Sequence, residues 1–398
     1  MATSRTRRPF NLKMNAHRRL PFTVDEYRRR YDHAIALLKA AGLDALLIRS
    51  PENICYLTGY ETPGYYGYHC LLLARDQQPV LVARRLELTN VPEFSWLVRT
   101  APVADDASPF DVTARTLDKM GLSRGRLGVE KSGWFFTVEE FEGLQQRLPR
   151  ARFEDGSMLV EQARMVKSEP EVEMIRRSVD KAEKAFLAGA RATRPGVTED
   201  QIAGALHKVW CEAGAEFTGL PNFIVSGRRS GACHATWRGR KLNQNDNCFF
   251  EICASTNRYA GVAYRTVTVG KVKPKLRRLA NASIGALEAV LAAIKPGVAC
   301  HTIDRIGHRE FVKAGFGKDH VHRIGYSIGV NFPPDWGEGQ IISIRKGEQR
   351  LLQENMTFHL VPGCLLFDEM GVVLGATVRV TANGCENLNT LPIKLYEQ

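Results

Sequence analysis

The chain has 398 residues, of which 44% are hydrophobic and 25% charged, a composition typical of a globular protein with two domains. No apolar run approaches the ~18 residues of a membrane-spanning helix, so we expect no membrane partner. The nine cysteines are scattered without a C-x-x-C pair. They favour buried thiols in a reducing cytoplasm over a disulfide framework.

Half of the formal net charge of +12 lies at the start of the chain, because the first 20 residues hold six Arg and Lys and no acid. This segment lacks the hydrophobic stretch of a secretory signal, so we expect residues 1–21 to be a basic, disordered tail. A transit peptide and an anion-binding arm are the alternatives. Basic and acidic residues are mixed elsewhere, and no aromatic-plus-basic motif indicates a nucleic-acid partner.

Residues 22–160 predict an α/β domain. Residues 24–41 have apolar side chains at helical spacing, and Gly42 suits a C-terminal cap. Strand-like runs follow at 44–50, 70–74 and 79–83, with the last two paired around a polar turn.

Residues 161–398 predict a second domain that contains an internal repeat. Ser168 and Glu171 form a capping box for a helix over 170–193. A Pro-Gly-Val turn at 195–197 then leads into a second helix that ends near residue 214. The same helix–turn–helix pattern recurs 101 residues further on, with its turn at 296–298. Duplicated helix pairs, each followed by strands, indicate a pseudo-twofold α+β domain.

Four stretches resemble a known family: 247–270, 323–329, 355–363 and 371–384. Together they resemble the creatinase/aminopeptidase P family (M24), whose catalytic domain has the pita-bread fold. The resemblance covers residues 22–390. It implies an α+β fold class, with a creatinase-type N-terminal α/β domain followed by a pseudo-twofold pita-bread domain.

Metal-binding members of this family carry two Asp, a His and two Glu as metal ligands. Carried over by resemblance, these positions fall on Glu251, Val262, Tyr326, Val361, and Gly375 or Ala376. Val, Gly and Ala side chains have no lone pair for a cation, and one carboxylate does not hold a dimetal centre. We therefore expect no metal and no other cofactor.

Two residues are candidates for catalysis. His234 lies where the family places a His on the active-site floor, and in metal-free creatinases that His is the general acid/base. Glu251 in place of the first Asp resembles the ectoine hydrolase branch, in which this Glu is implicated in attacking the substrate. The structural alternatives are a core His and an ion pair of Glu251 with Arg258 or Arg265.

Further residues are substrate-binding candidates. The stretches 325–339 and 356–363 resemble signatures of the same branch, with Trp336 as a possible aromatic face for substrate. The family resemblance also implies a homodimer in which loops of the N-terminal domain reach the partner's active site. The complete set of binding candidates is Tyr326, His359, Trp336, Arg265, Tyr65, His69 and Arg85.

The chain departs from the ectoine hydrolase pattern at three polar positions. Ala260 stands where that branch has a His, and Val373 and Ala376 stand where it has two Glu. A pocket without these hydrogen-bonding groups should reject a polar cyclic amidine by roughly 2–5 kcal/mol. We therefore expect a more apolar cavity and a substrate other than ectoine.

These features predict a cytoplasmic, homodimeric, metal-independent hydrolase that acts on a C–N bond of a small amine- or amino-acid-derived metabolite. One alternative is a lyase, isomerase or cyclase of specialised metabolism on the same scaffold. Another is a non-catalytic pita-bread protein that binds peptide or protein. The last is a metallopeptidase that recruits Asp319, His320 and His322 beside Glu251.

Overall fold

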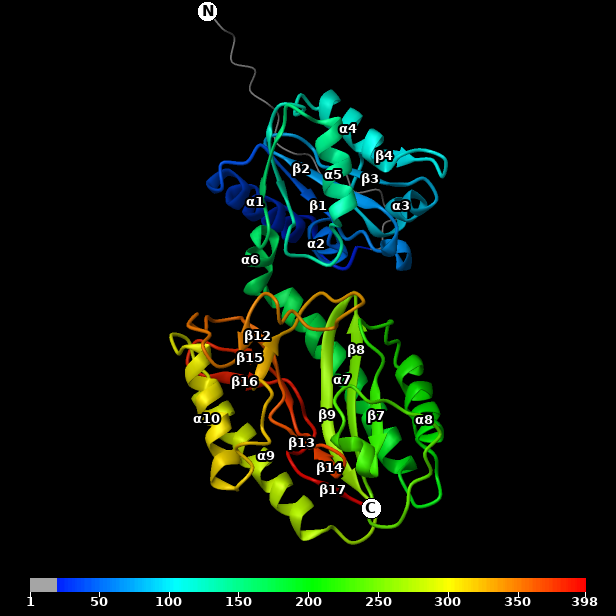
Figure 1. The fold of residues 1–398 in the computed structure, drawn as a ribbon, viewed down its shortest axis with the longest axis vertical. Coiled ribbons are helices and arrows are strands. Elements are labelled where there is room, and N and C mark those ends of the chain that lie inside the picture. The colour runs from blue at the N-terminus through cyan, green and yellow to red at the C-terminus, as the bar shows by residue number, and fades with distance from the viewer. Residues whose placement is uncertain (1–19) are drawn as a thin grey trace, which may run out of the picture. The chain divides into compact units, whose positions relative to one another are not determined.

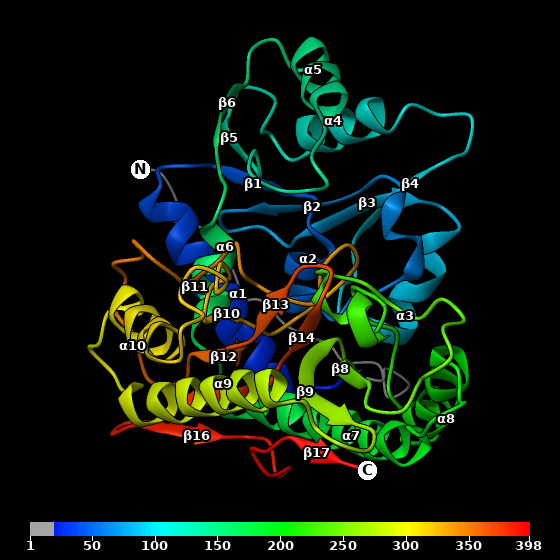
Figure 2. The same ribbon diagram turned by 60° about the horizontal axis from the view of Figure 1, so that its bottom comes forward.

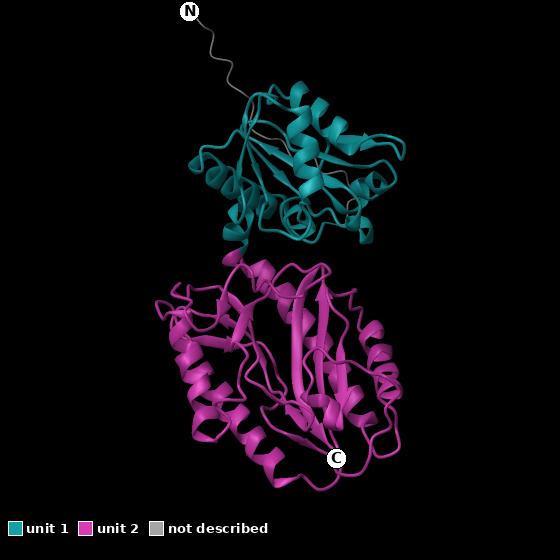
Figure 3. Cartoon of the chain, viewed as in Figure 1, with its two compact units in different colours: residues 1–164 teal, residues 165–398 magenta. Residues whose placement is uncertain are grey.

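The computed structural model describes residues 20–398, so the basic tail predicted for residues 1–21 lies almost wholly outside the described residues. The chain forms two compact units, residues 1–164 and 165–398 (Figure 3). The boundary predicted after residue 160 lies four residues before this division. Among the described residues, no helix is long and apolar enough to cross a membrane.

The first unit is built on a six-stranded sheet with the strand order β4-β3-β2-β1-β5-β6 (Figure 1). The strands are β1 (Ala45–Ile48), β2 (His69–Ala74), β3 (Val80–Arg84), β4 (Thr100–Val103), β5 (Arg126–Val129) and β6 (Arg152–Asp155). The helices are α1 (Val24–Ala40), α2 (Pro51–Thr58), α3 (Val91–Phe94), α4 (Pro109–Lys119), α5 (Val138–Arg147) and α6 (Leu159–Met165), with short 3₁₀ helices η1 (Pro63–Tyr66) and η2 (Glu87–Asn90). Leu117 of α4 and Leu144 of α5 pack with Leu47, Leu72 and Val82 in the core of this unit.

The second unit contains two helix pairs and two main sheets. Its helices are α7 (Glu169–Ala192), α8 (Glu199–Glu212), α9 (Pro274–Ala293) and α10 (Cys300–Lys313), with the 3₁₀ helix η3 (Gly227–Gly231). One sheet has the order β17-β9-β8-β7, and the other has the order β11-β10-β12-β15-β16. The strands are β7 (Phe223–Ser226), β8 (Asn247–Thr256), β9 (Tyr259–Thr268), β10 (Gly325–Ser327), β11 (Ser343–Ile344), β12 (Thr357–Leu360), β13 (Cys364–Leu366), β14 (Met370–Val372), β15 (Ala376–Val380), β16 (Cys385–Asn387) and β17 (Tyr396–Glu397).

The internal repeat is present in the structure. Gly196, in the turn between α7 and α8, has a φ of 84°, and Gly297, between α9 and α10, has a φ of 82°. Both turns need this left-handed conformation, which glycine adopts without a steric penalty. Each glycine N–H donates to a leucine carbonyl in a later loop, that of Leu242 at 2.8 Å and that of Leu352 at 2.9 Å. The pseudo-twofold α+β domain predicted from the sequence is thus confirmed.

The two sheets meet where β9 runs beside the start of β15. The Val262 N–H donates to the Thr377 hydroxyl at 3.1 Å, and the Gly375 N–H donates to the Tyr264 carbonyl at 2.9 Å. Figures 1 and 2 show α7 and α8 beside β7–β9, and α9 and α10 beside β10–β12.

One face of β8 and β9 packs into the hydrophobic core. Phe250 and Ile252 pack with residues of α7 such as Phe186. Because side chains alternate along a strand, Glu251 points to the opposite face. This second face carries the candidate site.

Candidate active site

Glu251 lies in the middle of β8, flanked in register by Phe223 of β7 and Tyr264 of β9. Its side chain is buried, with a relative exposure of 9%. A buried carboxylate needs a charged or hydrogen-bonding partner. Neither alternative partner considered from the sequence supplies it, because the guanidinium groups of Arg258 and Arg265 bind main-chain carbonyls.

The partner of Glu251 comes from the other sheet. His359 of β12 is fully buried, and its Nε2 lies 3.5 Å from Oε1 of Glu251. Neither ring nitrogen of His359 makes a hydrogen bond to another described residue. Buried polar groups in native proteins are almost always hydrogen-bonded, and an unsatisfied one costs about 1–3 kcal/mol. The Glu251–His359 pair is therefore a polar site within an otherwise apolar surround, which is a characteristic of ligand pockets.

Two tyrosines surround the pair. The rings of Tyr264 and Tyr326 each contact the His359 ring edge-on, with centroids 5.5 Å apart. Burial, reinforced by the nearby Glu251 carboxylate, raises the pKa of both phenols well above the ordinary value of 10. Both hydroxyls thus stay protonated at neutral pH and can donate a hydrogen bond.

Trp336 packs beside Tyr326 and hydrogen-bonds to it. The indole Nε1 donates to the Tyr326 hydroxyl at 3.0 Å, and the indole ring packs on Phe223 with centroids 5.3 Å apart. Trp336 is only 1% exposed. The sequence-based prediction that Trp336 offers an aromatic face to substrate is therefore corrected, because in this structure the indole is buried and hydrogen-bonds to Tyr326.

His234 lies at the exposed edge of the site. Its ring stacks on Phe223, with centroids 5.4 Å apart and an interplanar angle of 24°. Its φ of 54° is in the left-handed region, which is uncommon for a residue other than glycine and recurs at functional sites. A hydrogen bond with the Cys233 thiol, together with the carboxylates of Glu251 and Asp335, raises the pKa of His234 above its ordinary value of 6.5. This shift favours the protonated imidazole, which can donate a proton, and the ring lies within electrostatic reach of Glu251.

The positions of the family's metal ligands are brought together by the fold, but their side chains do not fit a metal. Val262 of β9 is fully buried, Val361 follows β12 and is 4% exposed, and Ala376 pairs with Leu360 in register. Within residues 20–398, no group of three or more His, Cys, Asp and Glu side chains is arranged to hold a metal ion. The donor set at this place, one carboxylate and one imidazole, does not suit a dimetal centre.

The alternative of a metallopeptidase that recruits Asp319, His320 and His322 beside Glu251 is not supported. His320 stacks on Phe311 at a centroid distance of 4.1 Å, and its Nδ1 lies 3.1 Å from Nδ1 of His308. His322 donates from Nδ1 to the carbonyl of Arg323, and Asp319 is exposed. These side chains do not converge with Glu251 on one point.

The prediction that Arg265 binds substrate is also corrected. Its guanidinium is fully buried and binds the carbonyls of Gly375, Leu391 and Pro392. Arg265 lies three residues after Val262 on a strand, and the period of two places it on the face away from Glu251. It ties β9 to the C-terminal segment and does not contact the candidate site.

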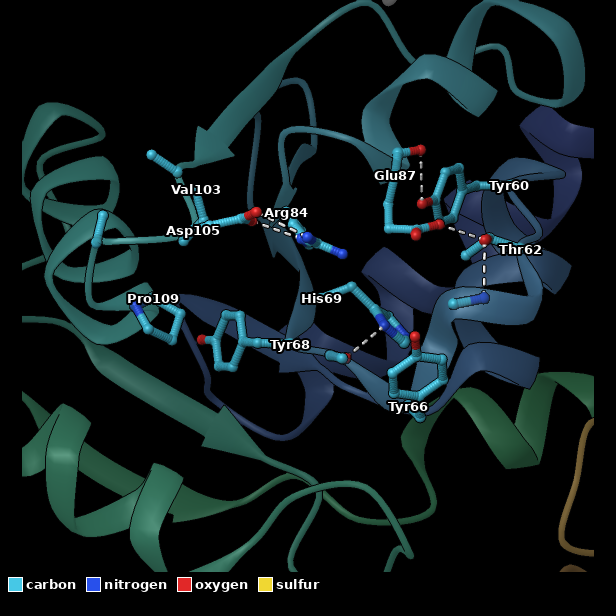
Figure 4. A pocket seen from close by; sticks show the side chains of 14 residues that line it. Tyr60, Thr62, Tyr66, Tyr68, His69, Arg84, Glu87, Val103, Asp105 and Pro109 are labelled. Carbon is cyan, nitrogen blue, oxygen red and sulfur yellow. Dashed lines mark hydrogen bonds and ion pairs between the residues drawn. The ribbon is translucent and has the colours of Figure 1, made fainter.

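The first unit has a cavity of about 430 Å³, shown in Figure 4. Of the three candidates predicted in this unit, only His69 lines it. The ring of Tyr65 instead contacts Phe135, and Arg85 is exposed next to the cavity-lining Arg84. Other lining residues that sequence reasoning missed are Tyr60, Tyr66, Tyr68, Glu87 and Asp105.

The polar groups of this cavity are largely paired with one another. Arg84 forms an ion pair with Asp105, and the Tyr60 hydroxyl donates to the carbonyl of Glu87 (Figure 4). His69 Nδ1 donates to the Gly67 carbonyl at 3.2 Å, and burial lowers the pKa of His69 to about 3. His69 is therefore neutral at physiological pH. Whether these residues contact the partner's substrate stays a prediction.

Tyr264 and Phe223 of the second unit were also missed. Tyr264 follows Val262 by two residues, so strand alternation alone places it on the face of Glu251. Phe223 had no comparable signal, because its position beside Glu251 depends on how β7 pairs with β8.

Comparisons with known proteins agree with this architecture. Residues 173–382 match metallopeptidase family M24, and residues 30–166 match the creatinase/prolidase N-terminal domain. The first match covers more than half of the chain, so this chain belongs to metallopeptidase family M24.

Two relatives align over nearly their whole length. The chain is 29% identical to the ectoine hydrolase of Halomonas elongata, over 95% of this chain and 98% of that protein. It is 30% identical to the uncharacterized hydrolase/peptidase y4tL of Sinorhizobium fredii, over 94% of this chain and 97% of that protein.

Solved structures show the same fold. A prolidase from Thermococcus sibiricus has a TM-score of 0.85 at 20% identity, covering 95% of this chain and all of that one. An X-Pro aminopeptidase from Thermotoga maritima has a TM-score of 0.81 at 22% identity, covering 92% of this chain and 99% of that one. The predicted fold class is therefore confirmed.

Proposed function

We propose that this chain is a metal-independent hydrolase that cleaves a C–N bond in a small amine- or amino-acid-derived molecule. A hydrolase is the activity that family M24 and the similar ectoine hydrolase support. The observation that carries metal independence is the replacement of the ligand set. Where metallopeptidases of this family hold two cations, this chain has a Glu251–His359 pair among buried valine and alanine side chains.

The arrangement suits covalent catalysis. Glu251 Oε attacks the electrophilic carbon of the C–N bond, and the leaving nitrogen takes the proton of His234. Water then attacks the substrate-derived carbon of the resulting mixed anhydride and gives one proton to His234, which releases the acid product and frees the Glu251 carboxylate. One water is consumed, and both side chains return to their starting protonation states. His359, which lies beside Glu251, and the Tyr326 hydroxyl supply polar contacts to the reacting centre.

The walls of the site favour a substrate with fewer hydrogen-bonding groups than ectoine. Ala260, Val373 and Ala376 are all fully buried, and each stands where the ectoine hydrolase pattern has a polar side chain. A substrate that presents a polar group to these walls would lose its hydrogen bonds to water without replacement. We therefore propose an amide, lactam or amidine whose polar atoms are limited to the reacting centre and one ionic group.

A homodimer is also part of the proposal. The cavity of the first unit is lined by aromatic side chains and by the ionic groups of Arg84, Asp105 and Glu87. In the family pattern, loops of this unit approach the active site of the partner. Tyr66, which is 83% exposed at this cavity, and His69 are the residues we assign to that contact.

The proposal is tested by incubating chelator-treated protein with cyclic amidines, lactams, guanidino acids and amides, followed by mass spectrometry of the small molecules and of the intact protein. We expect turnover in the wild type and its loss in Glu251→Gln. We also expect a substrate-derived adduct on Glu251 in wild-type protein quenched during turnover, and a loss of turnover in His234→Asn, which lacks the proton donor of the first step. Lys184→Met is the matched control, since Lys184 pairs with Asp180 on an exposed surface of α7.

Two outcomes would overturn parts of the proposal. Restoration of activity only by added Zn, Mn or Fe would exclude metal independence. Unchanged turnover in Glu251→Gln would exclude the nucleophile.

A further inference from the structure

A cavity of about 580 Å³ in the catalytic-type unit lies between α10, the loop before β10 and the loop after β11. Helix α10 is the yellow helix beside α9 in Figure 1. None of the residues assigned to the candidate active site lines this cavity. The lining residues are His301, Asp304, Arg305, His308, His320, Val321, His322, Arg323, Arg345 and Lys346.

The lining is strongly cationic. It contains three arginines and one lysine against a single carboxylate, that of Asp304. Arg305, Arg345 and Lys346 are exposed, and among the described residues none of them forms a close ion pair with a carboxylate; Lys346 lies within electrostatic reach of Asp304, and Arg345 within reach of Glu348. Like charges gathered around one space repel each other unless an anion lies between them.

The only acid of the cavity does not balance this charge. Asp304 Oδ1 accepts a hydrogen bond from the Ile324 N–H at 3.3 Å, and burial raises the pKa of this carboxyl above its ordinary value of 3.8. The fourth cation, Arg323, donates from one nitrogen to the Ser343 hydroxyl at 3.0 Å and lies 4.4 Å from the centroid of the Tyr326 ring. Its remaining guanidinium donors are left for another acceptor.

A buried histidine supplies a second, independent observation. His320 is 5% exposed and stacked on Phe311, and its Nδ1 contacts Nδ1 of His308 at 3.1 Å. Its other nitrogen, Nε2, is buried and has no hydrogen-bond partner among the described residues. Buried polar atoms are nearly always satisfied, so His320 is a strained, unsatisfied group in a residue that lines the cavity, and a small movement of its ring would let Nε2 reach a ligand there.

We propose that this cavity binds a small phosphorylated anion. Arginine guanidinium groups match phosphate oxygens with paired hydrogen bonds, and histidine rings add single donors. A cation is disfavoured by the four fixed positive charges, and no group of described residues is arranged to hold a metal. The volume lies within the range of about 300–1,000 Å³ found for small-molecule sites, so it admits a phosphorylated metabolite as well as free phosphate.

This cavity shares no lining residue with the candidate active site, but two of its residues interact with residues of that site. Arg323 lines the cavity and stacks on Tyr326, whose ring contacts His359. His322 lines the cavity and lies within electrostatic reach of Glu251 and His234. A bound anion would therefore change the electrostatic environment of the segment from His322 to Tyr326, which contributes residues to both sites.

The test is isothermal titration calorimetry of the full chain with inorganic phosphate, pyrophosphate, a sugar phosphate and citrate. We expect one saturable site per chain for the phosphoryl compounds. Arg305→Ala should weaken binding tenfold or more, since one charge-assisted hydrogen bond contributes about 1.5–3 kcal/mol. Arg309→Ala is the matched control, because it removes the same charge one turn along α10 from a residue outside the cavity.

Lys346→Ala provides a second variant on a different element, and circular dichroism would establish that each variant is folded. Equal weakening by Arg305→Ala and Arg309→Ala would show non-specific charge attraction and overturn the proposal. The same holds for an absence of binding at millimolar ligand. Tighter binding of citrate than of pyrophosphate would overturn the phosphoryl assignment.

Discussion

A buried ion pair fixes the segment that carries Trp336 to the rest of the catalytic-type unit. Lys167 Nζ lies 2.6 Å from Glu338 Oε2, and both side chains are 1% exposed. The Ser327 hydroxyl donates to the same carboxylate oxygen at 3.2 Å, and the Glu338 N–H donates to the Ser327 carbonyl. Lys167→Met keeps the apolar stem of the side chain and removes its charge, so the buried Glu338 carboxylate loses the Lys167 ammonium.

The expected cost is large. Removing one partner of a buried ion pair typically costs 3–5 kcal/mol, because the remaining charge stays desolvated. The exposed pair Lys184–Asp180 has a nearly equal distance of 2.7 Å but exposures of 57% and 60%. Lys184→Met should therefore cost less than about 1 kcal/mol. The two lysines form ion pairs of similar geometry and differ in burial.

Urea unfolding followed by tryptophan fluorescence and circular dichroism measures the difference. We expect Lys167→Met to lower the free energy of unfolding of the second unit by several times the Lys184→Met value. The double variant Lys167→Met/Glu338→Gln should recover at least half of the loss, since the carboxylate that lost the Lys167 ammonium is then also neutral. Equal costs for the two lysine variants would refute the reasoning from burial.

The remaining predictions concern individual site residues. If His234 is the general acid, its raised pKa means that kcat/KM should fall as pH rises through an apparent value above 6.5, and His234→Asn should abolish this limb of the pH–rate profile. Trp336→Phe removes the hydrogen bond to Tyr326 and should cost about 0.5–1.5 kcal/mol in urea unfolding, while Tyr326→Phe in that background adds little more. An additive double variant would show that the two groups are not coupled. The folded pKa of His69 is about 3 and the unfolded value is 6.5, so between these values only the unfolded state binds a proton at His69. Stability of the first unit should thus decrease by up to about 1.4 kcal/mol per pH unit on acidification, and His69→Gln should flatten this slope; an unchanged slope would exclude His69 as its source.

Much of the fold was predictable because its signals are local. Pro-Gly turns, capping residues and strand alternation depend on a few neighbouring residues, and their repetition at 101 residues revealed the two halves of the catalytic-type unit. The loss of the metal ligands was also readable, since a valine cannot bind a cation in any structure. Alternation along β9 further shows that Arg265 and Val262 lie on opposite faces.

Only the tertiary structure decided which distant side chains meet. His359 and Glu251 are 108 residues apart, and their contact depends on how the two main sheets of the second unit pack against each other. The same long-range packing buries Trp336 behind Tyr326 and gathers four cations from α10 and two loops around one cavity. Residue chemistry and local pattern are encoded in short stretches of sequence, whereas burial and partners are determined by contacts that form only when the whole unit folds.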